Sequence, residues 1–480
     1  KYVVKYVLDK CPNEIEFFDK FVEKGLLEKL TKLVNSNFAR VDHEEVIRIL
    51  KEANVKWEFE PEYGGDIAKE HEKYITEYFN GPVFIKNWPK DIKAFYMKQN
   101  ADGKTVAAVD LEVPGAGELM GGSQREEDYD KLVNQFGIKD FSELLGKIED
   151  PARLMKRGVI FGHRDFDKLV PLINGKKDFA VMTGMMPSGQ MHIGHKMVID
   201  QLKWYFEKGA SLSLSIADME SYAARGISFE KAKEIAINEY LANYIALGLD
   251  LTADNVNVYL QSQNKTLNDL TFKIAKRVNF NNMHAIYGFN ASTNIAHLYV
   301  PLVQVADILL PQTEEFGGPK QVVVPVGVDQ DPHLRLTRDI AAKLNEEYGF
   351  LAPASTYHRF LTGLTGDKMS SSKPNTAIYL NETPKQAEKK VKSSKTGGRE
   401  TLDEQKELGG RPDECVIYEM LVYHLVDDDK ELEKLREECV NGELMCGHCK
   451  VHAAELMKDF FEDLKVKQEE SVEIAESLFD

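Results

Sequence analysis

Apolar residues recur at helical spacing through the first sixty positions. The stretch NEIEFFDKFVEKGLLEKLTKLV shows this pattern, and VDHEEVIRILKEA repeats it after an aspartate that can cap a helix. From Gly81 the pattern changes to short β-rich runs, PVFIKNWP, IKAFYMK and TVAAVDLEV, with an Asp-Gly turn in QNADGK. GAGELMGG breaks the strand pattern, and EEDYDKLVNQFG is acidic and helical. We therefore predict an α+β module with an antiparallel sheet over residues 1–126.

From Phe179 onward, predicted strands and helices alternate. The strands are FAVMTG, LSLSIAD, NVNVYLQS and QVVVPVGVDQ, and helices such as HKMVIDQLKWYFEKGA and FEKAKEIAINEYLANYIALGL lie between them. This alternation predicts an α/β fold with a Rossmann-like, doubly wound parallel sheet. After Leu380 the strand pattern stops and the chain is helical to Asp480. We predict a Rossmann-like domain with a helical lead-in over residues 127–385 and an all-helical domain over residues 386–480.

Composition and charge limit the function classes. A chain of 480 residues allows two to four domains. The net charge of −17 argues against field-driven binding to nucleic acid, although local basic patches can still hold phosphates. Five cysteines, an odd number, do not suggest a disulfide framework, so we expect a reducing compartment. No apolar run reaches the length of a membrane span, and KYVVKYVLDK lacks a signal-peptide core. We expect a cytoplasmic protein without a membrane partner.

The first chemical motif is FAVMTGMMPSGQMHIGH. The predicted strand ends at Gly184, and His192 and His195 open a helix with Gly194 between them. A helix N-terminus binds anions through its unpaired N–H groups and its dipole. Gly194 leaves the backbone open to a purine or ribose, and the two imidazoles can face one phosphate. Two surface histidines are the alternative, which the strand–turn–helix context weakens.

The second motif, GDKMSSSKP, lies 176 positions further on, counted from His192 to Lys368. Lys368 and Lys373 stand among three serines, and mobile lysines suit a leaving group whose charge grows in the transition state. A solvated loop is the alternative for this motif alone. Together, in this order and at the two ends of the alternating region, the motifs resemble the hallmark motifs of class I aminoacyl-tRNA synthetases.

That resemblance implies ATP as a substrate, accompanied by Mg²⁺. In the family, the His pair and the Lys loop stabilise the pentavalent α-phosphate and the departing pyrophosphate, and the amino-acid carboxylate is the nucleophile. Catalysis is then positioning and electrostatics, and no metal ligand from the protein is expected. Carried over, the catalytic residues are His192, His195 and Lys368. The ATP-binding residues are Gly184, Pro187, Ser188, Gly194, Met369, Ser370, Ser371 and Lys373.

Three further stretches narrow the resemblance. RGVIFGHRDFDKLV, VPVGVDQDPHLRLTRDIA and TGGRETLDEQKELGG are similar to tryptophanyl-tRNA synthetases of the archaeal and eukaryotic kind, and the likeness runs from about Asp128 to the C-terminus. It implies activation of tryptophan, transfer to tRNA(Trp) and a homodimer. A tyrosyl enzyme shares the two hallmark motifs and remains the nearest alternative. A non-catalytic paralogue that binds tryptophan or tRNA is another.

The amino-acid pocket departs from the eukaryotic pattern, in which a Tyr and a Gln help to hold the indole. Met182 and Ser215 stand at those positions here. Asp307 stands where bacterial-type enzymes have an Asp that accepts the indole N–H; a phenol hydroxyl would also satisfy it, and a helix-surface or N-cap role stays open. The resemblance implies a tryptophan site made of Met182, Ser215, Glu220, Gln304, Asp307 and Gln330. Asp329 and Asp331 either belong to it or hold a turn.

Two features of the C-terminal part stay open. A basic tract that includes Lys389, Lys392 and Arg399 is a candidate tRNA contact, and a solvated charge run is the alternative. The resemblance makes the helical tail the anticodon-binding domain. CGHC at 446–449 suggests a redox pair or, with nearby histidines, a zinc site. We expect an ordinary helix instead, because no second ligand pair stands at zinc spacing.

Residues 1–126 resemble part of the catalytic core of class II asparaginyl-tRNA synthetases. The likeness rests on EPEYGGDIAKEHEKYITEYFNGPVFIKNWPKDIKAFYMKQNADGKTVAAVDLEVPGAGELMGGSQRE. In that family the positions of Asp110 and Glu118 hold Mg²⁺ and ATP, and the stretch near Asp66 and His71 lies by the amino-acid site. Two Arg-bearing motifs of that family are not found in the chain. We therefore expect no adenylate from this module, and docking, dimerisation or tRNA contact remain open.

Overall fold

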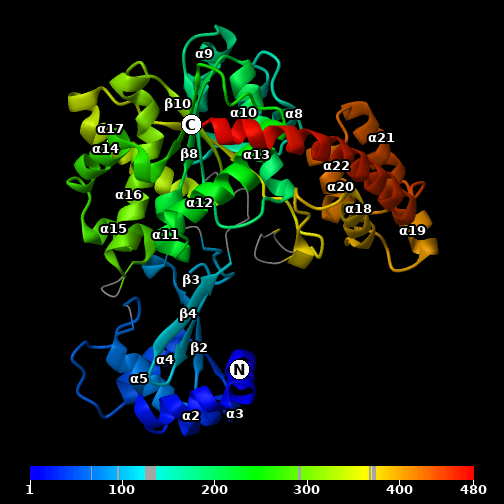
Figure 1. The fold of residues 1–480 in the computed structure, drawn as a ribbon. Coiled ribbons are helices and arrows are strands. Elements are labelled where there is room, and N and C mark those ends of the chain that lie inside the picture. Colours follow the sequence, from blue (N-terminus) through cyan, green and yellow to red (C-terminus); the bar gives the residue numbers. More distant parts are fainter. Residues whose placement is uncertain are drawn as a thin grey trace. The chain divides into compact units, whose positions relative to one another are not determined.

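The computed structural model describes residues 1–65, 67–93, 97–124, 137–289, 293–366, 369 and 374–479. The chain divides into two compact units, residues 1–132 and residues 133–480 (Figure 1). Each unit has its own sheet, which joins no strand of the other. The α/β class predicted from the sequence is confirmed, and the two units are described separately.

The first unit begins with helices. Its described residues form α1 (Tyr2–Lys10), α2 (Pro12–Phe21), α3 (Leu26–Asn35), α4 (His43–Glu52) and α5 (Lys69–Tyr78), and η1 (Lys90–Ile92) is a 3-10 turn. Gly25, at φ 91°, separates α2 from α3. Asp42 occupies the N-cap of α4, but its side chain does not cap it. Its carboxylate instead lies 2.5 Å from Lys86 Nζ and accepts a hydrogen bond from Asn87, because β2 runs alongside.

The sheet of the first unit has the order β1-β2-β3-β4. Its strands are β1 (Ala39–Asp42), β2 (Val83–Pro89), β3 (Thr105–Val113) and β4 (Gly117–Ser123). β1 pairs parallel with β2 and the other pairs are antiparallel, so the sheet is mixed and not wholly antiparallel. GAGELMGG was wrongly read as an interruption, because most of it forms β4. The predicted strand IKAFYMK includes 94–96, which lie outside the described residues. The core of the first unit contains Val46, Leu50, Ile75, Ile85 and Trp88.

The second unit contains a seven-stranded sheet of order β5-β6-β11-β10-β7-β8-β9. The strands are β5 (Lys139–Asp140), β6 (Ile160–Arg164), β7 (Ala180–Met185), β8 (Ser211–Ile216), β9 (Val256–Leu260), β10 (Val322–Gly327) and β11 (Ala354–His358). β11, β10, β7, β8 and β9 are parallel, and β5 and β6 are antiparallel. The four predicted strands are β7 to β10. The strand order reverses between β7 and β10, the switch point at which doubly wound folds bind ligands.

Helices connect these strands. The α-helices are α7 (Ser142–Leu145), α8 (Arg153–Lys156), α9 (Val170–Asn174), α10 (Ile193–Glu207), α11 (Asp218–Arg225), α12 (Phe229–Ile235), α13 (Ala242–Ala246), α14 (Lys265–Ala275), α15 (Phe280–Tyr287), α16 (Ile295–Leu309) and α17 (Asp331–Tyr348). The π-helical segment η3 (Ala236–Leu241) joins α12 to α13. The 3-10 turns are η2 (Phe166–Lys168), η4 (Gln261–Gln263), η5 (Leu310–Gln312), η6 (Glu314–Phe316), η7 (Val328–Gln330), η8 (Pro374–Thr376) and η9 (Pro412–Glu414). The predicted helix EEDYDKLVNQFG lies, except for Gly137, outside the described residues.

One helical run is longer and more apolar than the sequence analysis allowed. Ile295–Gln312 reaches the length and hydropathy of a membrane span, by length and composition only. In the structure 61% of this run is buried, and α16 packs against β7, β10 and α14. It therefore serves as a core helix of the second unit.

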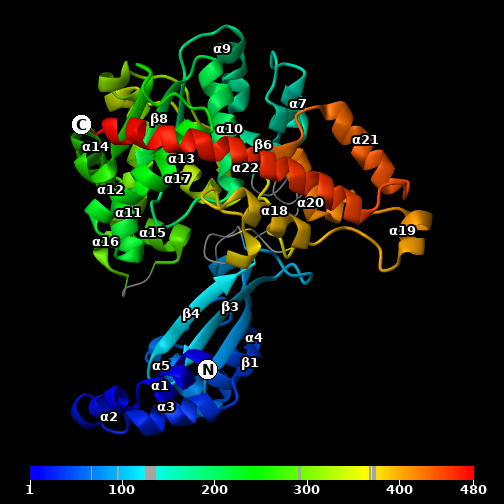
Figure 2. The same ribbon diagram turned by 45° about the vertical axis from the view of Figure 1, so that its right-hand side comes forward.

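The C-terminal part is helical, as predicted. It comprises α18 (Pro384–Ser393), α19 (Leu402–Leu408), α20 (Val416–Met420), the π-helical segment η10 (Leu421–Leu425), α21 (Asp429–Val440) and α22 (Cys446–Ser477). α22 runs beside α18, α20 and α13 (Figure 2). One cluster of buried residues continues from Phe179 and Leu214 near the sheet to Met457 and Phe461 of α22. The helical part and the sheet therefore share a single core.

Candidate active site

The predicted His pair stands at the start of α10, just after β7. The rings of His192 and His195 are 4.1 Å apart between centroids and tilted by 47°. Both side chains are half-buried. His192 is the N-cap residue, and its Nδ1 accepts a hydrogen bond from the Gly194 N–H at 3.1 Å. The histidines are therefore held together as a local unit of the helix start.

The first N–H groups of α10 are not available to an anion, contrary to the sequence-based expectation. The Ile193 N–H donates to Ile378 O at 2.9 Å. The Gly194 N–H donates to the His192 ring, and the His195 N–H donates to His192 O at 2.9 Å. The N-cap side chain and a neighbouring segment have satisfied the donors that a helix start leaves open. An anion here would instead meet the imidazoles.

The hydrogen bonds assign the ring proton of His192, whereas that of His195 depends on the tautomer. Nδ1 of His192 accepts from the Gly194 N–H, so a neutral His192 carries its proton on Nε2 and presents an Nε2–H donor. Nδ1 of His195 lies 3.1 Å from both the N–H and the carbonyl oxygen of His192, and it can accept from the first or donate to the second. Burial lowers the pKa of His195, opposed by a hydrogen bond with the His192 backbone.

Glycine is required at position 194 because a larger residue would collide with the ring of His192. A Cβ at this position would lie 2.9 Å from both Nδ1 and Cε1 of His192 and 3.8 Å from Leu361 Cβ. The space that the sequence analysis reserved for a purine or ribose is thus taken by the His192 ring. Gly194 consequently sets the position of the first histidine.

The remaining predicted ATP residues lie in two places. Gly184, at the end of β7, and Ser188 are exposed, whereas Pro187 is buried and its carbonyl accepts from Ser221 Oγ at 3.2 Å. Ser188 hydrogen-bonds to the phenol of Tyr240. Met369 is 4% exposed. Lys368, Ser370, Ser371 and Lys373 lie outside the described residues.

The described flanks of GDKMSSSKP are tied to the start of α10. The Leu364 N–H donates to Thr376 O at 3.0 Å and the Met369 N–H donates to Leu361 O at 3.2 Å, so the two flanks bond to each other. Beyond them, the Leu380 N–H donates to Met191 O at 2.9 Å, and His192 pairs with Tyr379 in an antiparallel bridge. The second motif therefore leaves and rejoins the fold next to the first.

Asp307, on α16, is the centre of a buried polar cluster. Its Oδ1 accepts from Ser215 Oγ at 2.9 Å and from Tyr259 OH at 2.8 Å, and its Oδ2 accepts from Gln261 Nε2 at 2.6 Å. The side chain is 1% exposed. The structure thus brings together two residues of the predicted tryptophan site, Asp307 and Ser215. It also excludes a surface or N-cap role for Asp307, which lies inside the helix.

Burial raises the pKa of Asp307 to about 7, although the three hydrogen bonds oppose this shift. Glu220, whose own pKa is raised by burial, adds repulsion. Asp307 therefore changes charge near neutral pH. A carboxylate has about four lone-pair sites, and three donors leave capacity for one more.

Tyr259 and Gln261 were missed by the sequence analysis. They lie at the end of β9, where Tyr259 is in register with Ser215 of β8 and Ser215 is in register with Gly184 of β7, and Gln261 follows directly after the strand. The carboxyl ends of parallel strands line ligand sites, and this rule alone points to both residues. Gln261 Oε1 is buried and has no hydrogen-bond partner among the described residues, so the amide retains an open acceptor.

The other candidate pocket residues lie in three different surroundings. Gln304 of α16 and Gln330 of η7 are neighbours, with Nε2 and Oε1 3.4 Å apart. Met182 is buried in β7 and is the register partner of Ser213. Asp331 has a structural role: its carboxylate pairs with Arg164 at 2.6 and 2.8 Å and accepts from Tyr357 OH at 2.5 Å. It therefore fixes the start of α17 to β6 and β11.

The basic tract is partly occupied by local contacts. Lys392 pairs with Glu388 at 2.5 Å. Arg399 Nε donates to Gly409 O at 2.8 Å and holds the end of α19. Lys389 is exposed on α18, and no ion pair involves it among the described residues. Of the three predicted tRNA contacts, Lys389 alone projects a side chain without an identified intramolecular partner.

In the first unit, the acidic positions of the class II resemblance converge. A Cβ at Gly121 would lie 2.6 Å from Glu118 Oε1 and 2.9 Å from Asp110 Oδ1. Asp110 also pairs with Lys93 at 2.8 Å. Burial, together with the neighbouring carboxylates, raises the pKa of Glu112 to about 8. His71 is buried with Nε2 2.8 Å from Phe59 O, and Asp66 lies outside the described residues.

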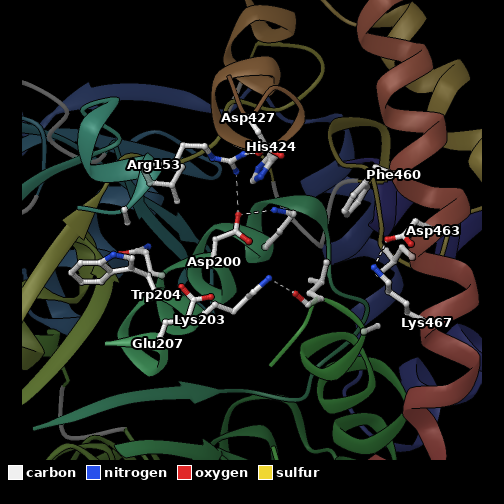
Figure 3. A pocket seen from close by; sticks show the side chains of 17 residues that line it. Arg153, Asp200, Lys203, Trp204, Glu207, His424, Asp427, Phe460, Asp463 and Lys467 are labelled. Carbon is white, nitrogen blue, oxygen red and sulfur yellow. Dashed lines mark hydrogen bonds and ion pairs between the residues drawn. The ribbon is translucent and has the colours of Figure 1, made fainter. Parts of the chain in front are cut away.

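A separate cavity of about 550 Å³ lies along another part of α10 (Figure 3). Its polar lining includes matched pairs, such as Lys196 with Asp200 at 2.6 Å and Lys467 with Asp463 at 2.5 Å. His424, also in the lining, is buried, and this strongly lowers its pKa. None of the predicted site residues lines this cavity. It is therefore distinct from the His pair and the Asp307 cluster.

Comparison with known families gives two matches along the chain. A family described as tRNA synthetases class I (W and Y) matches residues 174–462. A family described as tRNA synthetases class II (D, K and N) matches residues 1–159. The first match covers the His pair, the second motif and the Asp307 cluster, and more than half of the chain.

Individual relatives agree with the first match. The tryptophan–tRNA ligase of Methanocaldococcus jannaschii is 53% identical over 350 residues, which cover 72% of this chain and 94% of the relative. That of Methanopyrus kandleri is 48% identical over 351 residues, covering 72% and 92%. The crystal structure of tryptophanyl-tRNA synthetase from Aeropyrum pernix superposes with a TM-score of 0.70 at 43% identity, covering 73% of this chain and 96% of that one.

Proposed function

The chain belongs to the tryptophanyl-tRNA synthetase family of class I synthetases and is a tryptophan–tRNA ligase, and we propose that its second unit performs both steps of the reaction. In the first step the carboxylate of tryptophan attacks the α-phosphorus of ATP, and pyrophosphate leaves. In the second step the 3′-terminal ribose hydroxyl of tRNA(Trp) attacks the tryptophanyl carbonyl, and AMP leaves.

One observation carries the assignment of the site. The backbone that flanks the lysine motif hydrogen-bonds to residues 191–193, and Leu361, which receives the Met369 N–H, lies beside Gly194. The two hallmark motifs are thus joined at the carboxyl end of β7, although 176 residues separate them. This supports the proposal that Lys368 and Lys373 act on the phosphates that His192 and His195 contact.

In the proposed mechanism the protein supplies no nucleophile. His192 donates a hydrogen bond from Nε2 to the α-phosphate, whose negative charge grows as the carboxylate adds, and His195 does the same in the form that carries a proton on Nε2. Lys368 and Lys373 meet the departing pyrophosphate. Such donors act most strongly when they are already oriented, and the hydrogen bonds at Nδ1 orient both rings. Gly184, Pro187, Ser188, Met369, Ser370 and Ser371 complete the proposed nucleotide site.

The proposed tryptophan site is the Asp307 cluster. In its ionised form Asp307 accepts the indole N–H as a fourth hydrogen bond, and Ser215, Tyr259 and Gln261 hold the carboxylate in place. Gln304 and Gln330 face the amino-acid backbone, Met182 packs beside the ring, and Glu220 closes the edge. An indole N–H offsets the cost of the buried charge. A phenol hydroxyl would do the same, so the preference for tryptophan rests on the family membership.

We propose that Mg²⁺ enters this site as a companion of the nucleotide. No group of three or more His, Cys, Asp or Glu side chains in the described ranges is arranged to hold a metal ion. Mg²⁺ commonly binds through substrate phosphates with few protein ligands. The proposal further includes a homodimer, a cytoplasmic location and an anticodon contact through the helical part, with the exposed Lys389 as one of its cations.

Single-turnover charging tests the proposal. The full chain, in molar excess over radiolabelled tRNA(Trp), is mixed with ATP, Mg²⁺ and tryptophan. We expect tryptophanyl-tRNA to form in one exponential phase and a Lys368→Ala chain to form it at least about 100-fold more slowly. Binding of tRNA or tryptophan without charging by the intact chain would favour a non-catalytic paralogue.

A further inference from the structure

Four of the five cysteines gather in the C-terminal helical part. Cys415 immediately precedes α20, Cys439 lies in the last turn of α21, and Cys446 and Cys449 lie in the first turn of α22. All four are half-buried with free thiols. The sequence analysis rejected a metal site at CGHC because no second pair of ligands was visible. The fold supplies that pair from Cys415 and Cys439.

The loop between α18 and α20 packs directly against these side chains. A Cβ at Gly398 would lie 2.7 Å from Cys446 Sγ, and a Cβ at the adjacent Gly397 would lie 3.2 Å from Cys415 Cβ. Cysteines from two chain segments therefore contact neighbouring residues of one loop. A side chain larger than hydrogen at Gly397 or Gly398 would therefore displace Cys415 or Cys446.

The far end of the same loop meets the third segment. A Cβ at Gly410 would lie 2.6 Å from Cys439 Sγ, and the Gly410 N–H donates to Cys439 O at 2.8 Å. The Arg411 N–H donates to Gly397 O, also at 2.8 Å, so the two ends of the loop are joined. Cys439 is thereby brought beside Cys415 and Cys446.

Cys449 completes the group. It follows Cys446 by three residues on α22, and such residues share a helix face. Cys449 interacts electrostatically with Cys415, Cys439 and Cys446. Nearby, Arg436 pairs with Asp413 at 2.9 Å and fixes α21 to the turn before Cys415. His452, the zinc candidate on the same helix, pairs instead with Glu431.

We propose that Cys415, Cys439, Cys446 and Cys449 form a thiolate metal centre that holds together α20, α21, α22 and the loop 396–411. Four thiolates are the ligand set of structural Zn²⁺ and of iron–sulfur clusters. Binding converts thiols to thiolates and releases their protons to solvent. The centre is independent of the proposed catalytic function.

The four thiols lie in one region, but their sulfur atoms do not surround a common metal position. Within the described ranges, no three His, Cys, Asp or Glu side chains are already arranged to hold an ion. A Zn–S bond of about 2.3 Å requires sulfurs about 3.8 Å apart. Closure to a zinc site would require the cysteine side chains to change their χ1 rotamers. An iron–sulfur cluster is wider and needs less closure.

The test measures metal and sulfide on the full chain. The protein is purified without oxygen or chelator from cells supplied with zinc and iron, and analysed by mass spectrometry of metals, sulfide assay and visible absorbance. We expect about one zinc per chain, or about four iron atoms with as many sulfides. Cys439→Ser and Cys446→Ser are expected to lower the content by about tenfold, whereas Cys11→Ser, a control in the first unit, is not.

A second measurement uses the unmodified chain, so its result does not depend on whether the variants fold. Removal of the metal by a chelator that takes zinc or iron is expected to lower the melting temperature and to expose four additional thiols to a thiol reagent. Readdition should reverse both effects. Less than about 0.1 metal per chain, with all five thiols reactive in the native protein, would overturn the proposal. Because these readouts do not involve charging, they distinguish its failure from failure of the catalytic assignment.

Discussion

Replacing Asp307 with asparagine separates the charge of this residue from its shape. The Asn side chain keeps an oxygen for Ser215 and Tyr259. Its amide group would face Gln261 Nε2 as a second donor, but Gln261 Oε1 has no partner among the described residues, so a flip of the Gln261 amide restores the contact. We therefore expect D307N to fold and to differ from the parent chain mainly in charge.

The effect on tryptophan follows from the loss of a charged acceptor. A hydrogen bond to a charged group contributes about 1.5–3 kcal/mol and a neutral one about 0.5–1.5 kcal/mol. The difference corresponds to about a tenfold rise in the Kd for tryptophan at pH 8. With the pKa of Asp307 raised to about 7, the parent chain loses affinity as the pH falls through 7. The Asn variant should show no such change.

Stability gives a second, independent measure. The pKa of Asp307 is about 7 in the folded chain and 3.8 ordinarily. Between pH 4 and 7 the folded state therefore holds a proton that the unfolded state has released, so this group makes stability fall as pH rises. About three pH units at about 1.4 kcal/mol each give at most about 4 kcal/mol. D307N removes this slope.

Isothermal titration with tryptophan and urea unfolding, each at pH 5.5 and pH 8, measure both effects. Tyr222→Phe, an exposed change elsewhere in the second unit, serves as the control. If D307N bound tryptophan within twofold of the parent at pH 8 and kept the same dependence of stability on pH, Asp307 would be neither the indole acceptor nor the titrating group.

Three further changes test other parts of the account. Gly194→Ala places a methyl group 2.9 Å from the His192 ring, and we expect pyrophosphate exchange to slow by about 100-fold; an unchanged rate would show that the ring position is unimportant. Asp331→Asn breaks the buried pair with Arg164, and we expect urea unfolding to show a loss of about 3 kcal/mol; a loss below about 1 kcal/mol would contradict the structural role. Lys389→Ala should weaken tRNA binding and reduce its salt slope by about one, and equal effects from the paired control Lys392→Ala would remove the distinction between them.

The strands that could be predicted are those whose hydrophobic pattern is visible in their own residues. β7, β8, β9 and β10 are apolar or alternate regularly. β11 was missed because Ser355, Thr356 and His358 are buried polar residues, whose partners come from distant segments; Tyr205 OH, for instance, lies 3.4 Å from Thr356 Oγ1. β4 was missed because it is a glycine-rich, largely exposed strand, and its pairing with β3 is what makes it a strand.

The candidate site shows the same division. The histidine and lysine motifs can be recognised locally, because the chemistry requires particular residues at short spacing. The need for glycine at position 194 could not be recognised from the sequence, since the contact with the His192 ring depends on a side-chain rotamer. Tyr259 and Gln261 lie at the end of a strand that was predicted, but their contact with Asp307 could be seen only when β9 was placed beside β8. The cysteine group needed the whole helical part, because Cys415 and Cys439 are 24 positions apart.

Amino-acid-dependent exchange of pyrophosphate into ATP tests most directly whether the His pair and the lysine motif activate tryptophan. The account predicts exchange by the full chain with tryptophan, exchange with tyrosine that is at least about 100-fold weaker, and loss of the tryptophan-dependent rate in Lys368→Ala. Exchange driven by tyrosine, or an undiminished rate without Lys368, would contradict it.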